Sequence, residues 1–102
     1  LGGSFLPTME VLDLKIIGEK VQYQIALQAV NSSGEPLANK KIEVFAIGNE
    51  ETLYAQELQL SNNGEVEFVF SIPAKAYSYQ RLELNFEENE GYIISQKIRL
   101  PY

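Results

Sequence analysis

The chain has no histidine and no cysteine, so carboxylates, hydroxyls and tyrosines are the side chains that could do chemistry. Ser–His–Asp and Cys–His catalytic arrangements therefore lack a required member, and zinc sites of the usual kinds lack their ligands. Two carboxylates held at a defined separation can hydrolyse a glycosidic bond. The acidic residues fall, however, almost entirely in expected turns or on outward strand faces, and we interpret them as solvated surface. We predict a protein that is not an enzyme and that holds no cofactor and no metal.

Three polar segments could serve as sites for a ligand or a modification. The acidic turns at 49–51 and 87–90 offer oxygen atoms to Ca²⁺, but glutamate-rich turns without aspartate rarely give the spacing of dedicated calcium loops. We interpret both turns as solubilising. Asn31-Ser32-Ser33 fits the N-glycosylation pattern in an expected loop, which has meaning only in a eukaryotic secreted protein.

Aromatic side chains outside the expected core are the remaining candidates for binding. Tyr77 and Tyr79 follow Pro73 in an expected loop, Tyr92 lies beside the acidic turn, and Phe45 occupies an outward strand position. Tyrosine rings stack on sugars or dock a partner, although tryptophan, which has the largest flat face, is absent. Tyr79 also fits the corner tyrosine that packs within many β-sandwiches. We predict the four aromatic residues as partner contacts, with an apolar outer edge around Phe45.

Alternation of apolar and polar residues predicts that β-strands position these side chains. The clearest case is residues 21–29, where valine, tyrosine, isoleucine, leucine and alanine alternate with mostly glutamine. A period of two held this long would scatter the apolar groups around a helix, whereas it places them on one face of a strand. Similar patterns predict seven strands in all. Their approximate ranges are 8–16, 21–29, 42–47, 52–60, 66–72, 82–86 and 92–100.

Local irregularities add three expectations. In the first strand, Leu12, Leu14 and Ile16 share one face and Asp13 and Lys15 the other, which is typical of a half-buried strand. In residues 52–60 the apolar phase changes, which predicts a β-bulge near Gln56; a short amphipathic helix is the competing interpretation. Asn63-Gly64 is a strong hairpin signal, because both residues tolerate positive φ.

Seven short strands in 102 residues are typical of an immunoglobulin-like fold. We therefore predict an all-β chain forming a seven-stranded immunoglobulin-like antiparallel β-sandwich. Residues 8–102 form this single domain, and residues 1–7, punctuated by Gly2, Gly3 and Pro7, are a linker or an expression remnant.

The net charge of −6 disfavours nucleic acids and anionic lipid surfaces as partners. No run of about eighteen apolar residues exists to span a bilayer, so direct membrane insertion is not expected. The first residues lack the charged and apolar regions of a signal peptide. The chain is expected to be a piece of a longer protein.

Several segments together resemble bacterial Ig-like and macroglobulin-type (MG) domains over roughly residues 8–100. They are the strand VQYQIALQAV, the N-x-x-G-x-P-L-x-N connection from Asn31 to Asn39, the strand from Ile42 to Val44, and EVEFVFSIP from Glu65 to Pro73. The chain departs from these families at Leu60–Gly64, where a Thr-Asp pair is usual. The resemblance implies a spacer, adhesion or assembly module and carries over no catalytic residue.

The functional expectation is a non-catalytic module of a larger extracytoplasmic protein, whether on a cell surface, secreted or periplasmic. It would act as a structural spacer or as a protein-interaction and adhesion domain. The expected partners are neighbouring domains of the same polypeptide and, beyond them, another surface protein or a glycan. Two alternatives stay open: a carbohydrate-binding accessory module of a secreted glycoside hydrolase, and an MG domain of a protease-trapping macroglobulin-like protein.

Overall fold

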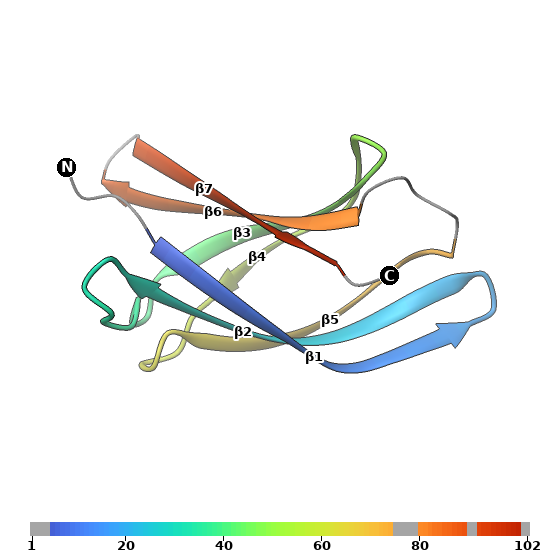
Figure 1. Cartoon of the computed structure of the whole chain (residues 1–102), viewed down its shortest axis with the longest axis horizontal. Helices are drawn as coiled ribbons and strands as arrows, with labels where there is room; N and C mark the ends of the chain where they lie inside the picture. The colour runs from blue at the N-terminus through green and yellow to red at the C-terminus, as the bar shows by residue number, and fades with distance from the viewer. Residues whose placement is uncertain (1–4, 75–79, 90–91, 101–102) are drawn as a thin grey trace.

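The computed structural model describes residues 5–74, 80–89 and 92–100, and it confirms an all-β sandwich of antiparallel strands (Figure 1). One sheet has the order β1-β2-β5 and the other β4-β3-β6-β7. The strands are β1 (Phe5–Ile17), β2 (Lys20–Asn31), β3 (Lys41–Gly48), β4 (Glu51–Gln59), β5 (Glu65–Pro73), β6 (Gln80–Asn89) and β7 (Tyr92–Arg99).

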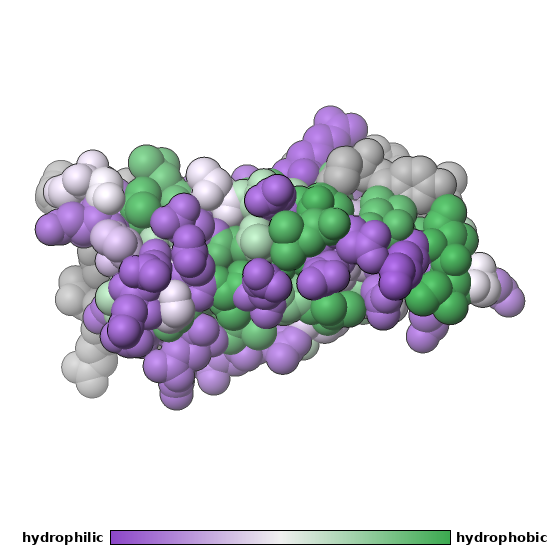
Figure 2. Space-filling model, turned by 90° about the horizontal axis from the view of Figure 1, so that it is seen from below, coloured by the Kyte–Doolittle hydropathy of each residue, from purple (hydrophilic) through white to green (hydrophobic). Residues whose placement is uncertain are grey.

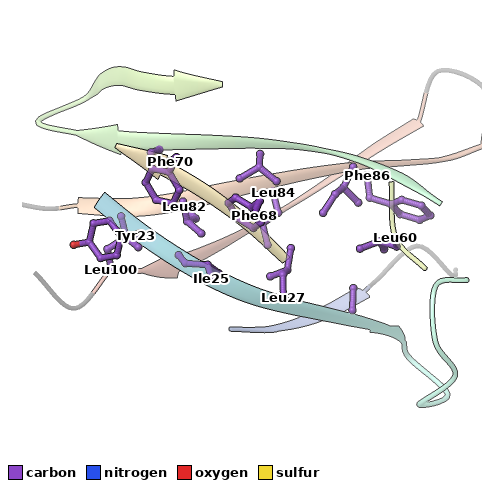
Figure 3. Packing of buried hydrophobic residues seen from close by; sticks show 14 of the residues in the cluster. Tyr23, Ile25, Leu27, Leu60, Phe68, Phe70, Leu82, Leu84, Phe86 and Leu100 are labelled. Carbon is purple, nitrogen blue, oxygen red and sulfur yellow. The ribbon is translucent and has the colours of Figure 1, made fainter. Parts of the chain in front are cut away.

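The core lies between the two sheets and follows directly from the alternation in the sequence. In β2 the side chains from Val21 to Ala29 at every second position are buried, and those between them are partly or fully exposed. Figure 3 shows the labelled side chains of both sheets directed into the space between them. The fully buried members with the largest side chains are Tyr23, Phe5, Ile25, Leu27, Ile42, Leu60, Ile72, Leu82, Leu84 and Val44.

Phe70 of β5 joins the two sheets through stacked rings. Its ring centroid lies 5.3 Å from that of Tyr23 on β2 and 4.9 Å from that of Tyr54 on β4. Phe5 and Phe86 meet edge to face at 5.6 Å. Such pairs add directional contacts to the burial of apolar area, and those that cross between the sheets hold the sheets in one relative position.

Two hairpins are closed by tight two-residue turns. Gly18-Glu19 joins β1 to β2, and Gly18 has φ +61°, as a type II′ turn requires of its first central residue. Asn49-Glu50 joins β3 to β4 with φ of 51° and 64°, as both central residues of a type I′ turn require. Glu50 adopts this backbone conformation without being glycine or asparagine, which costs free energy.

The expected hairpin at Asn63-Gly64 is wrong, because the strands on either side belong to different sheets. β4 pairs with β3, and β5 pairs with β2, so this turn carries the chain across the sandwich. Gly64, with φ +72°, is buried against the end of β2 and its amide oxygen accepts the N–H of Ala29 at 2.9 Å. The Asn-Gly signal identified a turn correctly, but a turn does not specify which strands pair.

Residues 51–59 are a strand, which confirms the strand interpretation over the helical one. The expected bulge near Gln56 is misplaced. Ala46 is opposite Tyr54 and Ile47 opposite Thr52, so the irregularity falls at Leu53. Beyond it the alternation resumes, with Gln56 in regular register opposite Val44.

β1 differs from expectation in its start, its regularity and its burial. It begins at Phe5, which is fully buried, three residues before the expected strand. Its register shifts between Val11 and Asp13, so a bulge lies at Leu12. Leu14 and Ile16 do face the same side as Tyr23 and Val21, but they are 37% and 63% exposed. The expectation that their shared face is the buried side of a half-buried strand is therefore wrong for this part of β1.

The reason lies in the shape of the molecule. The body measures 43 × 25 × 18 Å, and the tip of the β1–β2 hairpin extends along the long axis beyond the strands of the other sheet (Figure 1). An inward-facing side chain is buried only where an opposing layer covers it. Among the described residues, no helix is long and apolar enough to cross a membrane.

Candidate functional site

The structure does not gather the four predicted aromatic contacts into one site. Phe45 is half-buried on the outer face of β3, opposite Ala55 and Glu83. β3 is an interior strand, so the expected apolar outer edge around Phe45 is wrong. Tyr92 is the first residue of β7, but its side chain lies outside the described part, as do Tyr77 and Tyr79 entirely.

A groove that sequence reasoning missed crosses the outer face of the β1-β2-β5 sheet, the face seen in Figure 2. It has a volume of about 590 Å³. The register places Ala26 between Glu10 of β1 and Glu67 of β5, so a small side chain forms the floor between two carboxylates. Only the register of three strands brings these residues together, and no local pattern signals it.

The lining determines what this groove could bind. Thr8, Gln28 and Glu65 form the next row across the same face, giving hydroxyl, amide and carboxylate groups. None of the aromatic side chains in the described ranges lines the groove, so it offers hydrogen bonds and negative charge but no stacking surface. Among the described residues, no three His, Cys, Asp or Glu side chains are arranged to hold a metal ion.

Arg81 is the one buried charged residue among those described, at 6% exposure. Its Nη2 lies 2.8 Å from Glu83 Oε2 and 3.3 Å from Glu50 Oε1, so it links β6 to the β3–β4 turn. The hydrogen bond to Glu83 raises the pKa of the Arg81 guanidinium, against the opposing effect of burial. Two carboxylates already balance this cation, and we interpret it as a structural clamp.

Asn31 serves the loop between β2 and β3. Its Oδ1 accepts the N–H groups of Ser33 and Glu35, both at 2.9 Å, and its Nδ2 donates to Glu35 Oε1 at 3.2 Å. An asparagine that bonds its own following backbone in this way closes a turn. The structure therefore gives Asn31 a conformational role in the loop where the glycosylation pattern falls.

The second half of β1 exposes a run of apolar side chains, which we call the β1 strip: Leu12, Leu14, Ile16 and Ile17. Figure 2 shows apolar surface toward the end of the molecule where the hairpin tip lies. All four residues are more than a third exposed. The sequence pattern alone had placed three of them, Leu12, Leu14 and Ile16, on one face of a half-buried strand.

Fold and surface together define a small all-β sandwich domain with a groove of mixed polar and apolar lining on one sheet and an edge strand that exposes apolar side chains. No family model matches the chain, and no curated protein matches it. Among solved structures, it is similar to a β-glucosidase from Listeria innocua in complex with isofagomine, with a TM-score of 0.40 and 9% sequence identity. The similarity covers 94% of this chain and 16% of that one.

Proposed function

We propose that this domain is a non-catalytic module of a larger extracytoplasmic protein, where it holds neighbouring domains at a fixed distance. The observation that carries the proposal is the path of the chain. β1 starts near one end of the long axis, and β7 runs away from that end toward the other (Figure 1). Segments attached before β1 and after β7 would then leave the body at different points along its long axis.

Rigidity supports the same role. Both sheets contribute to one continuous core, and Phe70 stacks on rings from both sheets. Close-packed interiors resist deformation, so the separation of the two ends would be kept under thermal motion. Kinship with Ig-like or macroglobulin-type domains belongs to this proposal, and so does an extracytoplasmic location; the shared sandwich architecture and the segments that resemble those families support it.

The absence of cysteine makes a direct distance test practical. Thr8→Cys and Lys97→Cys, at exposed positions on β1 and β7, would carry spin labels. We expect one narrow distance distribution, unchanged when folded domains are fused to both ends of the chain. The unfolded protein in guanidinium serves as the broad control. A broad distribution in the native fusion protein would overturn the spacer role.

A second candidate function rests on the groove over Ala26. Its carboxylate, amide and hydroxyl groups suit hydrogen bonding to sugar hydroxyls, which supports a carbohydrate-binding accessory module. The lack of a lining aromatic side chain weighs against a stacked-sugar platform. A glycan array with the unaltered domain and with Glu67→Ala decides this point: binding lost in the variant supports it, and no binding by the unaltered domain rejects it.

A further inference from the structure

We infer that the second half of β1 is a self-association edge, on which a second copy of this chain pairs antiparallel about Leu14. The first observation is where the exposed apolar side chains lie. Five of the six large exposed apolar residues in the described part belong to β1. They are Leu6, Leu12, Leu14, Ile16 and Ile17, and the sixth is Val69 of β5.

The backbone of this segment is also available. β1 is an edge strand that pairs with β2 alone in the described sheets, and it continues past the end of β7 toward the hairpin tip (Figure 1). The N–H of Leu14 donates to Oδ1 of the neighbouring Asp13 at 3.0 Å. The Asp13 side chain thus occupies a backbone N–H group that a pairing strand could otherwise bind. A backbone carbonyl of an adjacent copy can replace that side chain as the acceptor.

Charge selects the register of such a pairing. Directly opposite residues on antiparallel strands share a face. A two-fold axis at Leu14 places Leu14 opposite its own copy and Asp13 opposite Lys15 of the second copy, twice. Within one chain, Lys15 Nζ already lies 3.6 Å from Asp13 Oδ2, so the pairing exchanges the two internal ion pairs, one in each copy, for two between copies.

The neighbouring registers are worse. A shift that centres the axis on Lys15 sets two lysines face to face, and one centred on Asp13 sets two aspartates face to face. Registers in which the axis lies midway between Leu14 and either of its chain neighbours place Leu14 opposite a charged side chain, Asp13 or Lys15. Like charges directly opposite each other destabilise a pair. Among these registers, the segment from Asp13 to Lys15 therefore complements itself only when the axis lies at Leu14.

The other edge strands do not offer this combination. The exposed side chains of β7 at 95, 97 and 99 are serine, lysine and arginine, and those of β4 are mostly polar. On β5, Val69 is exposed between two glutamates and a serine. Edge strands commonly carry charges that prevent pairing, but on β1 the opposite charges are spaced so that a two-fold copy satisfies them.

We expect a weak dimer, because a ladder of about five residues on each copy buries less area than the roughly 1,200 Å² of a standard interface. For an interface this small we expect a dissociation constant of about 0.1 mM. Both ion pairs are exposed, so the association should weaken as salt is added. The result would be one continuous sheet with the order β5-β2-β1-β1-β2-β5.

Charge reversal provides the test, by sedimentation velocity at protein concentrations up to about 1 mM, several times the expected dissociation constant. Asp13→Lys and Lys15→Asp should each weaken self-association at least tenfold. An equimolar mixture of these two variants should associate again, because every lysine then faces an aspartate. The double variant Asp13→Lys/Lys15→Asp should regain self-association for the same reason.

Two control variants separate the edge from net charge. Glu67→Lys and Lys97→Asp make the same changes in charge at exposed positions on β5 and β7, and they should leave the association constant within about twofold. Circular dichroism checks that every variant is folded. A monomeric unaltered domain at 1 mM overturns the inference, and so does equal association by the single reversals or failure of the mixture to associate. The inference concerns the isolated domain and stands apart from the spacer role.

Discussion

At the scale of single residues, Gly64 shows how the lack of a side chain allows three backbone segments to meet. A Cβ at this position would lie 2.6 Å from the carbonyl oxygen of Ala29 and 3.0 Å from the amide nitrogen of Leu37. That same oxygen accepts the N–H of Leu37 at 3.1 Å. The turn after β4, the end of β2 and the loop after β2 therefore meet at a place where only glycine fits.

Gly64→Ala should lower the free energy of unfolding by about 2–3 kcal/mol, because it adds a backbone collision to the cost of positive φ. Gly34→Ala is the matched control: φ is +82°, but nothing lies within 4 Å of the added Cβ. It should cost about 1 kcal/mol, from the backbone conformation alone. Urea denaturation measures both, and equal costs would contradict the packing argument.

Arg81 gives the second prediction at this scale. Arg81→Met removes a buried cation and leaves Glu50 and Glu83 close together without it. Leaving partners of a buried pair uncompensated is destabilising, so the thermal midpoint should fall clearly. Lys15→Met, which breaks the exposed pair with Asp13, should change it little. A fall no larger for Arg81→Met than for Lys15→Met would show that the clamp contributes nothing.

At the scale of elements, the bulge at Leu12 explains why one alternating pattern does not describe the whole of β1. Met9 and Val11 are inward before the bulge, opposite Leu27 and Ile25, and Leu14 and Ile16 are inward after it. The inward phase therefore changes from odd to even positions along one strand. A sequence pattern therefore predicts the inward-facing residues of both halves of β1 correctly only if Leu12 is recognised as the extra residue of a bulge.

Deletion of Leu12 should preserve the fold, since Val11 and Asp13 would then follow each other in the register they already hold against β2. The expected cost is about 1 kcal/mol, and the straighter edge should aggregate more readily. Deletion of Gln24 is the control, because β2 pairs on both sides and a shift there disrupts two ladders. Amide chemical shifts and circular dichroism distinguish the outcomes, and unfolding by the Leu12 deletion would contradict the assigned bulge.

At the scale of the whole molecule, one core between the sheets carries the stability. Ile25→Ala removes a fully buried side chain from the middle of β2 and should cost about 2–5 kcal/mol. Val69→Ala acts on β5 next to the same region, but its side chain is 50% exposed on the outer face. It should cost about 0.5 kcal/mol. Guanidinium unfolding checks both, and comparable losses would place Val69 in the core.

The candidate sites were less predictable than the fold. The predicted contact Phe45 lies on an interior strand, and the groove over Ala26 and the β1 strip emerged only with the structure. Each depends on which strands are neighbours and how far one layer reaches over the other. The roles of Phe45, Tyr77, Tyr79 and Tyr92 in binding stay predictions.

The sequence by itself determined the number of strands, their type and, in most of them, the face that turns inward. Alternation with a period of two is a local property, and it works in β2, β3, β5 and β6 because each is covered along its inner face. Tertiary structure alone decided that β4 and β5 part at Gly64 and that the tip of the β1–β2 hairpin extends beyond the opposing sheet. Burial depends on what lies opposite a residue, and that partner is distant in the chain. Leu14 and Ile16 therefore face inward as their pattern predicts and yet remain exposed, at the edge where we place a second copy.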